Sequence, residues 1–235
     1  MEELFPRKWN DDYIDAPVID SQNQPSTNGE NMTAILAAAK GRYQMLFALL
    51  AGCGPMRAGE ALGLEIGKHI SKDFRTLYIR QKAKAGEIQP YLKTKNGERE
   101  VDLCVDLAEM LKAYVGTRTS GLLFHTSSGR QISQRNILRD SLHPSLKGLE
   151  HIRGGFNIFR RYRITLLGKS DCPDTLKHFW SGHAQTHISE RYAKLHGERE
   201  YRLEMGRADR AWIQDSGLSW PTWPTPSGGK CRVRR

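Results

Sequence analysis

The residues of this sequence best suited to chemistry are arginine, lysine, histidine and tyrosine, in a pattern that fits phosphate. Cleaving a phosphodiester without a metal requires a nucleophile, cationic donors that hold the phosphate oxygens, and an acid that protonates the leaving oxygen. Arginine suits the second task because its forked guanidinium matches phosphate and keeps its charge. Lysine suits the third because its ammonium can give up a proton. A tyrosine phenol is a plausible nucleophile only beside such cations.

Four short motifs carry these residue types in a fixed order along the chain. They are Gly54-Pro-Met-Arg57-Ala-Gly-Glu60, Asn157-Ile-Phe-Arg160, Ser181-Gly-His183 and Glu190-Arg-Tyr192. Lys93 and Lys95 stand between the first two motifs, and His183 precedes Tyr192 by nine residues. The sequence has no HExxH motif and no clustered Asp and Glu residues at metal-ligand spacing, so no metal is expected.

Taken singly, each motif also has a plain structural interpretation. Arg57 and Glu60 fit an ordinary helical ion pair, and Lys93 and Lys95 fit the solvated edge of a hairpin. Tyr192 falls on an apolar helical stripe, which favours a core tyrosine. Arg160 fits a basic helix face, and His183 fits a surface turn. Together, however, the four motifs and the two lysines fit one phosphate-cleaving chemistry better than a set of unrelated structural features.

Charge also indicates a polyanionic partner. The chain of 235 residues has a formal net charge of +10 and a pI near 9.6. Residues 1–30 carry two basic against seven acidic side chains, so the positive charge lies in the rest of the chain. Nucleic acid is the commonest partner of a protein with this charge. A merely basic soluble protein is the alternative at this level.

Cysteines and hydropathy predict a soluble intracellular protein. The four cysteines are widely spaced without a CxxC pattern, which argues against a zinc module and a disulfide scaffold and favours free thiols in a reducing cytoplasm. Apolar runs are too short for a membrane span, and the acidic start does not fit a signal peptide. We expect a cytoplasmic, nucleoid-associated protein.

Helical periodicity dominates the middle of the sequence. Apolar residues at i, i+3, i+4 and i+7 predict helices around 46–53 and 107–114. Gly52 and Gly54-Pro55 predict the end of the first of these helices, and a new helix is expected near Arg57. From residue 132 onward the pattern predicts helices at 132–143, 156–167, 173–181, 188–195 and 198–207.

Strand signals are confined to residues 75–124. Alternation over residues 76–80 predicts one strand, and residues 122–124 predict another short one. Asn96-Gly97 predicts a hairpin that pairs Lys95 with Glu98 and Lys93 with Glu100. The predicted fold class is therefore mainly α with a small antiparallel β-sheet (α+β).

In this order, the motifs resemble those of the tyrosine recombinase (phage integrase) family. The resemblance covers roughly residues 33–212 and is strongest in Cys53-Gly-Pro-Met-Arg57-Ala-Gly-Glu60-Ala-Leu-Gly-Leu64 and from Phe179-Trp-Ser-Gly-His183 to Arg191-Tyr192-Ala-Lys-Leu195. It implies a DNA breaking-rejoining catalytic domain at 31–212. Residues 1–30 are then an extended arm or linker, and residues 213–235 a flexible Pro/Gly-rich basic tail.

The resemblance also implies a role for each site residue. Arg57 and Arg160 would clamp the phosphate, His183 would donate a hydrogen bond to it, and Tyr192 would form a 3′-phosphotyrosyl bond. The general acid would lie in residues 92–95. Alternation places both lysines on one face. Lys93 is preferred because Lys95 abuts the turn, but Lys95 stays open.

Two departures from the family pattern qualify these roles. The family has His where this chain has Asn157, and asparagine can donate a hydrogen bond but cannot move a proton near neutral pH. The family also has an N-terminal helical clamp domain, and the roughly 30 residues before the matching region are too few for it. We therefore expect a chain that lacks this clamp.

The resemblance implies site-specific cleavage and rejoining of double-stranded DNA, with no metal or other cofactor and no membrane partner. It further implies a DNA-dependent homodimer or homotetramer. Residues 195–212 could pack against a neighbouring protomer or equally within their own chain. Two other functions stay open: a catalytically impaired, integrase-derived DNA-binding protein, and a relaxing activity of type IB topoisomerase chemistry.

Overall fold

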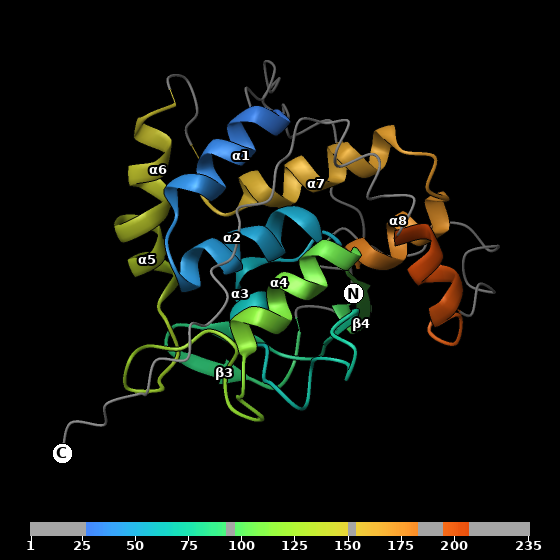
Figure 1. The fold of residues 1–235 in the computed structure, drawn as a ribbon, viewed down its shortest axis with the longest axis horizontal. Coiled ribbons are helices and arrows are strands. Elements are labelled where there is room, and N and C mark those ends of the chain that lie inside the picture. The colour runs from blue at the N-terminus through green and yellow to red at the C-terminus, as the bar shows by residue number, and fades with distance from the viewer. Residues whose placement is uncertain (1–26, 93–96, 150–153, 183–194, 207–235) are drawn as a thin grey trace, which may run out of the picture.

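The computed structural model describes residues 27–92, 97–149, 154–182 and 195–206. Its centre is helix α2 (Arg42–Gly52), which is buried on every side from Met45 to Gly52. A helix that is apolar all round must be surrounded, and α2 is packed against α1 (Gly29–Ala38), α4 (Val105–Val115) and α7 (Asn157–Lys169) (Figure 1).

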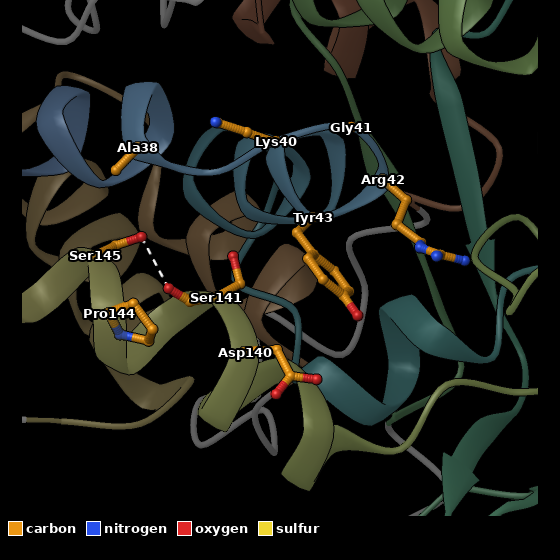
Figure 2. A pocket seen from close by; sticks show the side chains of 9 residues that line it. All are labelled: Ala38, Lys40, Gly41, Arg42, Tyr43, Asp140, Ser141, Pro144 and Ser145. Carbon is orange, nitrogen blue, oxygen red and sulfur yellow. Dashed lines mark hydrogen bonds between the residues drawn. The ribbon is translucent and has the colours of Figure 1, made fainter.

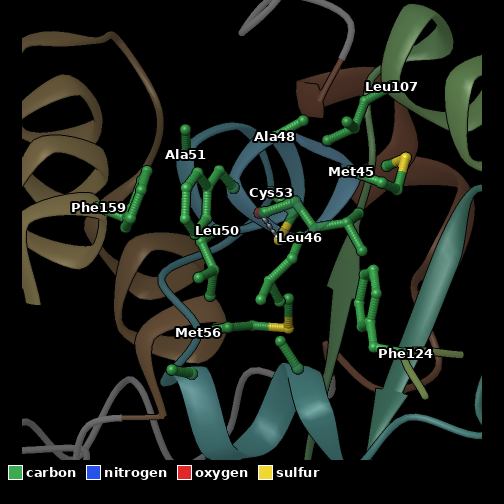
Figure 3. Packing of buried hydrophobic residues seen from close by; sticks show 14 of the residues in the cluster. Met45, Leu46, Ala48, Leu50, Ala51, Cys53, Met56, Leu107, Phe124 and Phe159 are labelled. Atoms are coloured by element: carbon green, nitrogen blue, oxygen red, sulfur yellow. Dashed lines mark hydrogen bonds between the residues drawn. The ribbon is translucent and has the colours of Figure 1, made fainter. Parts of the chain in front are cut away.

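Packing around α2 joins parts of the chain that are distant in sequence. Phe47 of α2 lies against Phe159 of α7, with ring centroids 5.0 Å apart. Leu107 of α4 and Phe124 lie on other sides of the same cluster (Figure 3). The core thereby fixes α7 relative to α2.

The break between α2 and α3 (Ala58–Leu62) confirms the prediction drawn from Gly52 and Gly54-Pro55. Arg57 occupies the N-cap of α3, and its backbone N–H donates to Glu60 Oε2 at 2.9 Å. A glutamate at the third position of a helix satisfies an amide that the helix itself leaves without a partner. This bond fixes the backbone that carries Arg57.

The described strands form two antiparallel pairs rather than the one sheet predicted. β1 (Thr76–Ile79) pairs with β4 (Arg99–Asp102), in a register that places Tyr78 opposite Glu100. β2 (Lys82–Lys84) pairs with β3 (Glu87–Gln89) across a tight turn at Ala85-Gly86. Both turn residues have positive φ, of 53° and 91°, as a two-residue hairpin requires.

Two strand predictions have different outcomes. Residues 93–96 lie outside the described residues, so the hairpin at Asn96-Gly97 stays a prediction. The predicted strand at residues 122–124 is wrong, because Leu122 makes only an isolated bridge with Glu65. This bridge consists of two backbone bonds, from Ile66 N–H to the Gly121 carbonyl and from Leu123 N–H to the Leu64 carbonyl, and the chain then enters a turn at residues 126–130.

Most of the predicted C-terminal helices are confirmed with small shifts. The first is a continuous run of α5 (Gln134–Ile137), the π-helical segment η3 (Leu138–Leu142) and α6 (His143–Lys147). α7 follows, then α8 (Asp174–Ser181) and a helix over residues 199–206. Of the predicted helix at 188–195, only Leu195 is described, and it lies in a turn.

The last described segment packs within its own chain. Leu195 is 4% exposed and belongs to a second apolar cluster with Leu167, Leu176, Phe179 and Trp180. Tyr201 and Met205 of the helix at 199–206 pack against this cluster. Of the two possibilities left open for residues 195–212, intramolecular packing therefore holds for residues 195–206.

Several predictions are only partly covered by the described residues. α1 begins at Gly29, inside the range expected for the arm, and the domain boundaries otherwise stay predictions. Within the described ranges, no helix is both long and apolar enough to cross a bilayer. The same ranges contain no group of three His, Cys, Asp or Glu side chains that could hold a metal ion.

Candidate active site

Arg57 and Arg160 are brought together at the segment between α2 and α3. Arg160, in the first turn of α7, donates through Nη1 to the carbonyl of Pro55 and through Nη2 to the carbonyl of Ser181 at 2.9 Å. Arg57 follows Pro55 by two residues, and its Nη1 lies 3.0 Å from Glu60 Oε1. The Arg57 side chain is 46% exposed, so it can reach a bound anion.

α7 is held in place by a second arginine one helical turn further on. Arg163 is buried, and its Nε donates to the carbonyl of Cys53 at 2.9 Å. Arg160 and Arg163 thus bind carbonyls two residues apart in the segment that leads into α3. The two predicted clamps are therefore fixed to the same backbone, although they are far apart in sequence.

The charge of Arg160 is destabilised by its surroundings. Burial, followed by the nearby charges of Arg57 and Arg99, lowers the pKa of Arg160 to about 10. The guanidinium is still charged at neutral pH. Because a neighbouring anion would relieve this repulsion, the position favours a ligand such as phosphate.

Arg99 also lies at this candidate site, and the sequence gave no reason to select it. It is 1% exposed, and it donates to the carbonyl of Trp180 at 2.8 Å, to that of Gly97 at 2.9 Å and to Glu60 Oε2 at 2.8 Å. A longer bond of 3.3 Å reaches the carbonyl of Pro55. Arg99 therefore connects β4, α3 and the end of α8 at one point.

Glu60 is the carboxylate at the centre of these arginines. Burial alone would raise its pKa, but the charge and hydrogen bond of Arg99, and then the bonds from Arg57, outweigh this and lower it. Glu60 is therefore ionised at neutral pH. Three arginines face this single carboxylate, which leaves the centre with an excess of positive charge.

The end of α8 is shaped to fit against Arg99. Gly182 caps the helix with φ of 63°, in the left-handed region that favours glycine. A Cβ at this position would lie only 3.2 Å from Arg99 Nη1. The glycine of the Gly182-His183 motif is thus needed both for its backbone conformation and for space beside the arginine.

The predicted site residues are only partly visible. Asn157 is exposed at the first position of α7, one turn before Arg160. Lys93, Lys95, His183 and Tyr192 lie outside the described residues. Gly97 and Trp180, which lie near the two segments that contain these four residues, both accept hydrogen bonds from Arg99.

Hollows with basic side chains lie next to Asn157. One of about 470 Å³ is lined by Asn157, Arg161 and Gln134, among others. Another of about 290 Å³ also borders Gln134 and is lined by Lys84 and Arg135. A Cβ added at Gly59 of α3 would lie 3.2 Å from Gln134 Nε2, so these hollows are close to the start of α3.

A third hollow lies elsewhere. It has a volume of about 710 Å³ and lies between the α1–α2 turn and the η3–α6 segment (Figure 2). Lys40, Arg42 and Asp140 are among its lining residues, and none of the candidate site residues is. We therefore assign it no part in the site.

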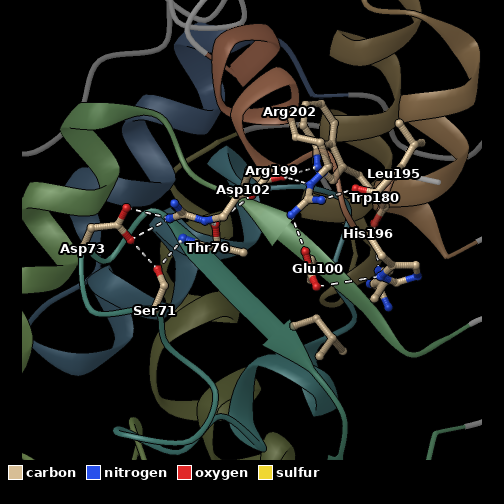
Figure 4. Close-up of polar contacts among 12 residues, drawn as sticks. Ser71, Asp73, Thr76, Glu100, Asp102, Trp180, Leu195, His196, Arg199 and Arg202 are labelled. Atoms are coloured by element: carbon tan, nitrogen blue, oxygen red, sulfur yellow. Dashed lines mark hydrogen bonds and ion pairs between the residues drawn. The ribbon is translucent and has the colours of Figure 1, made fainter. Parts of the chain in front are cut away.

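A second polar cluster lies along β4 and includes Glu100 and Asp102 (Figure 4). Arg202 donates to Asp102 Oδ2 at 2.8 Å, to Glu100 Oε2 and to the carbonyl of Leu195. Asp102 Oδ2 also accepts from Trp180 Nε1 at 3.0 Å. β4 thus contributes Arg99 to the first cluster and two carboxylates to the second.

Comparison by sequence gives no relative: the chain matches no protein-family model and no curated protein. Comparison by structure does. The XerA recombinase crystal structure matches with a TM-score of 0.55 and 14% identity, over 78% of this chain and 66% of that one.

Structures of the Tn1549 transposon integrase match to a similar degree. The complex with transposon right-end DNA has a TM-score of 0.58 and 16% identity, over 83% of this chain and 72% of that one. A complex with circular intermediate DNA has a TM-score of 0.55 and 14% identity, over 77% and 69%.

At this level of identity the likeness concerns the fold, and the aligned region spans about two thirds of the XerA chain. It agrees with the mainly helical fold and short antiparallel strands described above. The chain has the fold of the tyrosine recombinase catalytic domain.

Proposed function

We propose that this chain is a site-specific DNA recombinase that cleaves and rejoins strands through a 3′-phosphotyrosyl intermediate. The observation that carries the proposal is the convergence of Arg57 and Arg160 at the Pro55 segment, within a recombinase catalytic fold. Guanidinium groups that repel each other at the surface of a basic domain are suited to a phosphodiester. The Tn1549 integrase structures, which contain DNA, support this choice of substrate.

In the proposed reaction, the Tyr192 phenol gives its proton to a solvent water molecule and its oxygen attacks the phosphorus. The bond from phosphorus to the 5′ oxygen breaks, and that oxygen takes a proton from Lys93. Arg57 and Arg160 hold the non-bridging oxygens as negative charge builds. The phosphotyrosyl bond conserves the energy of the broken diester, so the reverse attack by a 5′ hydroxyl rejoins the strand without ATP.

Asn157 and His183 complete the proposed site. His183 donates a hydrogen bond to the same phosphate, and Asn157 donates another from the exposed start of α7. Because an amide cannot transfer a proton near neutral pH, Asn157 serves binding alone. The N-terminus of α7 at Asn157 favours the same anion through the positive end of the helix dipole.

The proposed partner is duplex DNA, bound by a homodimer or homotetramer that assembles on it. Arg161, Lys84 and Arg135 line hollows beside the site, where backbone phosphates on either side of the cleaved one can lie. A cytoplasmic, nucleoid-associated location belongs to this same proposal.

The test uses nicked suicide duplexes with a randomised central sequence. The nick lies at a fixed place in the duplex. Where a strand is cleaved a few nucleotides to the 5′ side of it, the short 5′-hydroxyl fragment diffuses away and rejoining stops. We expect the wild-type chain to form an adduct that survives a denaturing gel, and peptide mass spectrometry to place the nucleotide on Tyr192. Tyr192→Phe removes the nucleophilic oxygen, so its adduct falls to background.

Tyr201→Phe is the matched control because Tyr201 is half-buried beside the second apolar cluster and has no part in the proposed chemistry. It should retain adduct formation. DNA binding by the wild type without any adduct would instead support a non-catalytic DNA-binding protein. Adducts without sequence preference, with relaxation of supercoiled plasmid, would support type IB topoisomerase chemistry.

A further inference from the structure

Arg202 makes an unusual use of its guanidinium. Its side chain is 0% exposed, and its three nitrogens donate to three different acceptors. Two of these are the carboxylates of Asp102 and Glu100 on β4. The third is the main-chain carbonyl of Leu195.

The carboxylates account for the burial of Arg202. A buried guanidinium is costly unless it is paired and fully hydrogen-bonded, and two carboxylates satisfy that requirement. The Phe179 ring lies 5.2 Å from the guanidinium carbon and covers its face. These contacts explain how the helix at 199–206 is held on β4, but they do not require the bond to Leu195.

Arg199, on the same helix, provides a comparison. Its Nη2 donates to both carboxylate oxygens of Asp73, at 2.8 and 2.6 Å, and its Nε donates to Thr76 Oγ1 at 3.1 Å. Arg199 therefore fixes the helix to β1 and to the loop before it (Figure 4). It has no bond to the backbone at Leu195, whereas Arg202 has one.

Leu195 is fixed from two directions. Its side chain is packed in the cluster with Phe179 and Trp180, and its carbonyl is bound by Arg202. Three residues span at most about 11 Å. A fixed position for Leu195 therefore confines the position available to Tyr192, which precedes it by three residues.

Asp102, which binds Arg202, also links the Leu195 region to the end of α8. Asp102 Oδ2 accepts both from Arg202 Nε and from Trp180 Nε1. Trp180 is in turn held by Arg99 through its carbonyl. One strand, β4, thus fixes the chain on both sides of the segment that carries His183 and Tyr192.

We propose that Arg202 is a positioning residue, which holds the Leu195 carbonyl against β4 and thereby sets the place of Tyr192. The inference rests on the proposed role of Tyr192 as nucleophile. Arg202 acts through the backbone and touches neither DNA nor the reacting atoms.

The test compares Arg202→Lys with Arg199→Lys. Lysine keeps a cation beside Glu100 and Asp102, but its single ammonium cannot reproduce a fork that serves three acceptors. Both variants should lose some thermal stability. Single-turnover adduct formation, at saturating protein, should slow by about 10- to 100-fold in Arg202→Lys alone, since small misplacements of a reacting group have effects of that size. DNA affinity should be unchanged in both.

Hydrogen exchange gives a readout that does not depend on catalysis. Peptides covering residues 183–195 should exchange faster in Arg202→Lys than in wild type, and at the wild-type rate in Arg199→Lys. If Arg202→Lys does not fold, Glu100→Gln keeps the shape and an acceptor oxygen beside Arg202 Nη2 while removing one charge. It should change both readouts in the same direction by a smaller factor.

The two proposals can fail separately. Equal adduct rates in Arg202→Lys and Arg199→Lys, with wild-type exchange over residues 183–195, would overturn the positioning role and leave the proposed function standing. A wild-type chain that forms no adduct would overturn the proposed function. Exchange over residues 183–195 then decides by itself whether Arg202 anchors this part of the chain.

Discussion

Arg99 and Arg160 show how differently one residue type is used in this site. Arg99 is fully buried, and its donors serve Glu60 and three carbonyls, so it holds backbone segments together. Arg160 is only partly buried, and its pKa is lowered by burial and by the neighbouring arginines. The first arginine builds the centre, and the second is the one that would gain from a bound phosphate.

Single-residue variants can also identify the proposed general acid. A substrate with sulfur in place of the 5′ bridging oxygen releases a thiolate, which leaves without being protonated. Lys93→Ala should slow cleavage of the ordinary diester by about 10²- to 10⁴-fold, the usual range for a lost general acid. Its rate on the sulfur substrate should match that of the wild type.

Lys95→Ala is the matched control, since it removes the neighbouring ammonium on the same predicted face. It should cleave both substrates at nearly the wild-type rate. If the sulfur substrate restores the cleavage rate of Lys95→Ala and not that of Lys93→Ala, Lys95 is the general acid. Equal losses on both substrates for both variants would show that neither lysine protonates the leaving oxygen.

Some residues of the candidate site could be predicted from the sequence and others could not. Arg57 and Arg160 could be selected because their motifs have recognisable neighbours. Arg99 and Arg202 could not, because a charged residue in sequence indicates a solvated surface. Their burial depends on acceptors such as Trp180, 81 residues from Arg99, and Asp102, 100 residues from Arg202.

Among the elements, the close approach of β2 to α3 is what places the β2–β3 hairpin beside the site. It depends on Gly59, where an added Cβ would lie 2.8 Å from the carbonyl oxygen of Ala83. Gly59→Ala should therefore force β2 away from α3 and lower the free energy of unfolding by about 1–3 kcal/mol, as overpacking does. Urea unfolding measures the change.

Gly168→Ala is the matched control within a helix. Gly168 lies in α7, and apart from its chain neighbours and the backbone of its own helix no described atom lies within 4 Å of an added Cβ. Alanine there should raise the free energy of unfolding by about 0.5–1 kcal/mol, because it restricts the unfolded chain. A Gly59→Ala protein as stable as Gly168→Ala would contradict the packing described for α3 and β2.

Elements with local signals could be predicted, and pairings between distant segments could not. The apolar spacing of α2 and α4 and the Gly-Pro break before Arg57 are contained in a few consecutive residues. The pairing of β1 with β4 joins Tyr78 to Glu100, and nothing near either residue specifies the other. The turn at Ala85-Gly86 was also missed, since alanine rarely adopts the positive φ found there.

For the whole molecule, acid should weaken the fold through its paired carboxylates. Burial opposes the ionisation of Asp73, but hydrogen bonds from Arg199 and Ser71 outweigh it and lower its pKa from 3.8 to about 2. Because the pKa of Asp73 is lower in the folded state, its ionised carboxylate stabilises the fold, and this contribution is fully present at pH values above the ordinary pKa of 3.8. This contribution is lost as the pH falls through about 2.

Asp73→Asn tests this dependence. The wild type should be more stable than the variant at neutral pH, by at most about 1 kcal/mol since the pair is partly exposed. The difference should shrink as urea unfolding is repeated from pH 6 down to pH 2. In an Arg199→Gln background the same substitution should have a smaller effect, because only the bonds from Ser71 and the Arg75 amide then remain. A constant difference across this range would show that the pair with Arg199 is not its source.

The position of β4 between the two arginine clusters also bears on how the protein is made. Arg160 binds a carbonyl 105 residues earlier, and Arg202 binds a carboxylate 100 residues earlier. Contacts of this span form late, because long loops must close first. On the ribosome, α7, which carries Arg160, emerges before the helix at 199–206, which carries Arg202. A nascent chain would therefore contain both proposed phosphate clamps before Arg202 could hold Leu195, and under the proposed function it could bind DNA before it could cut it.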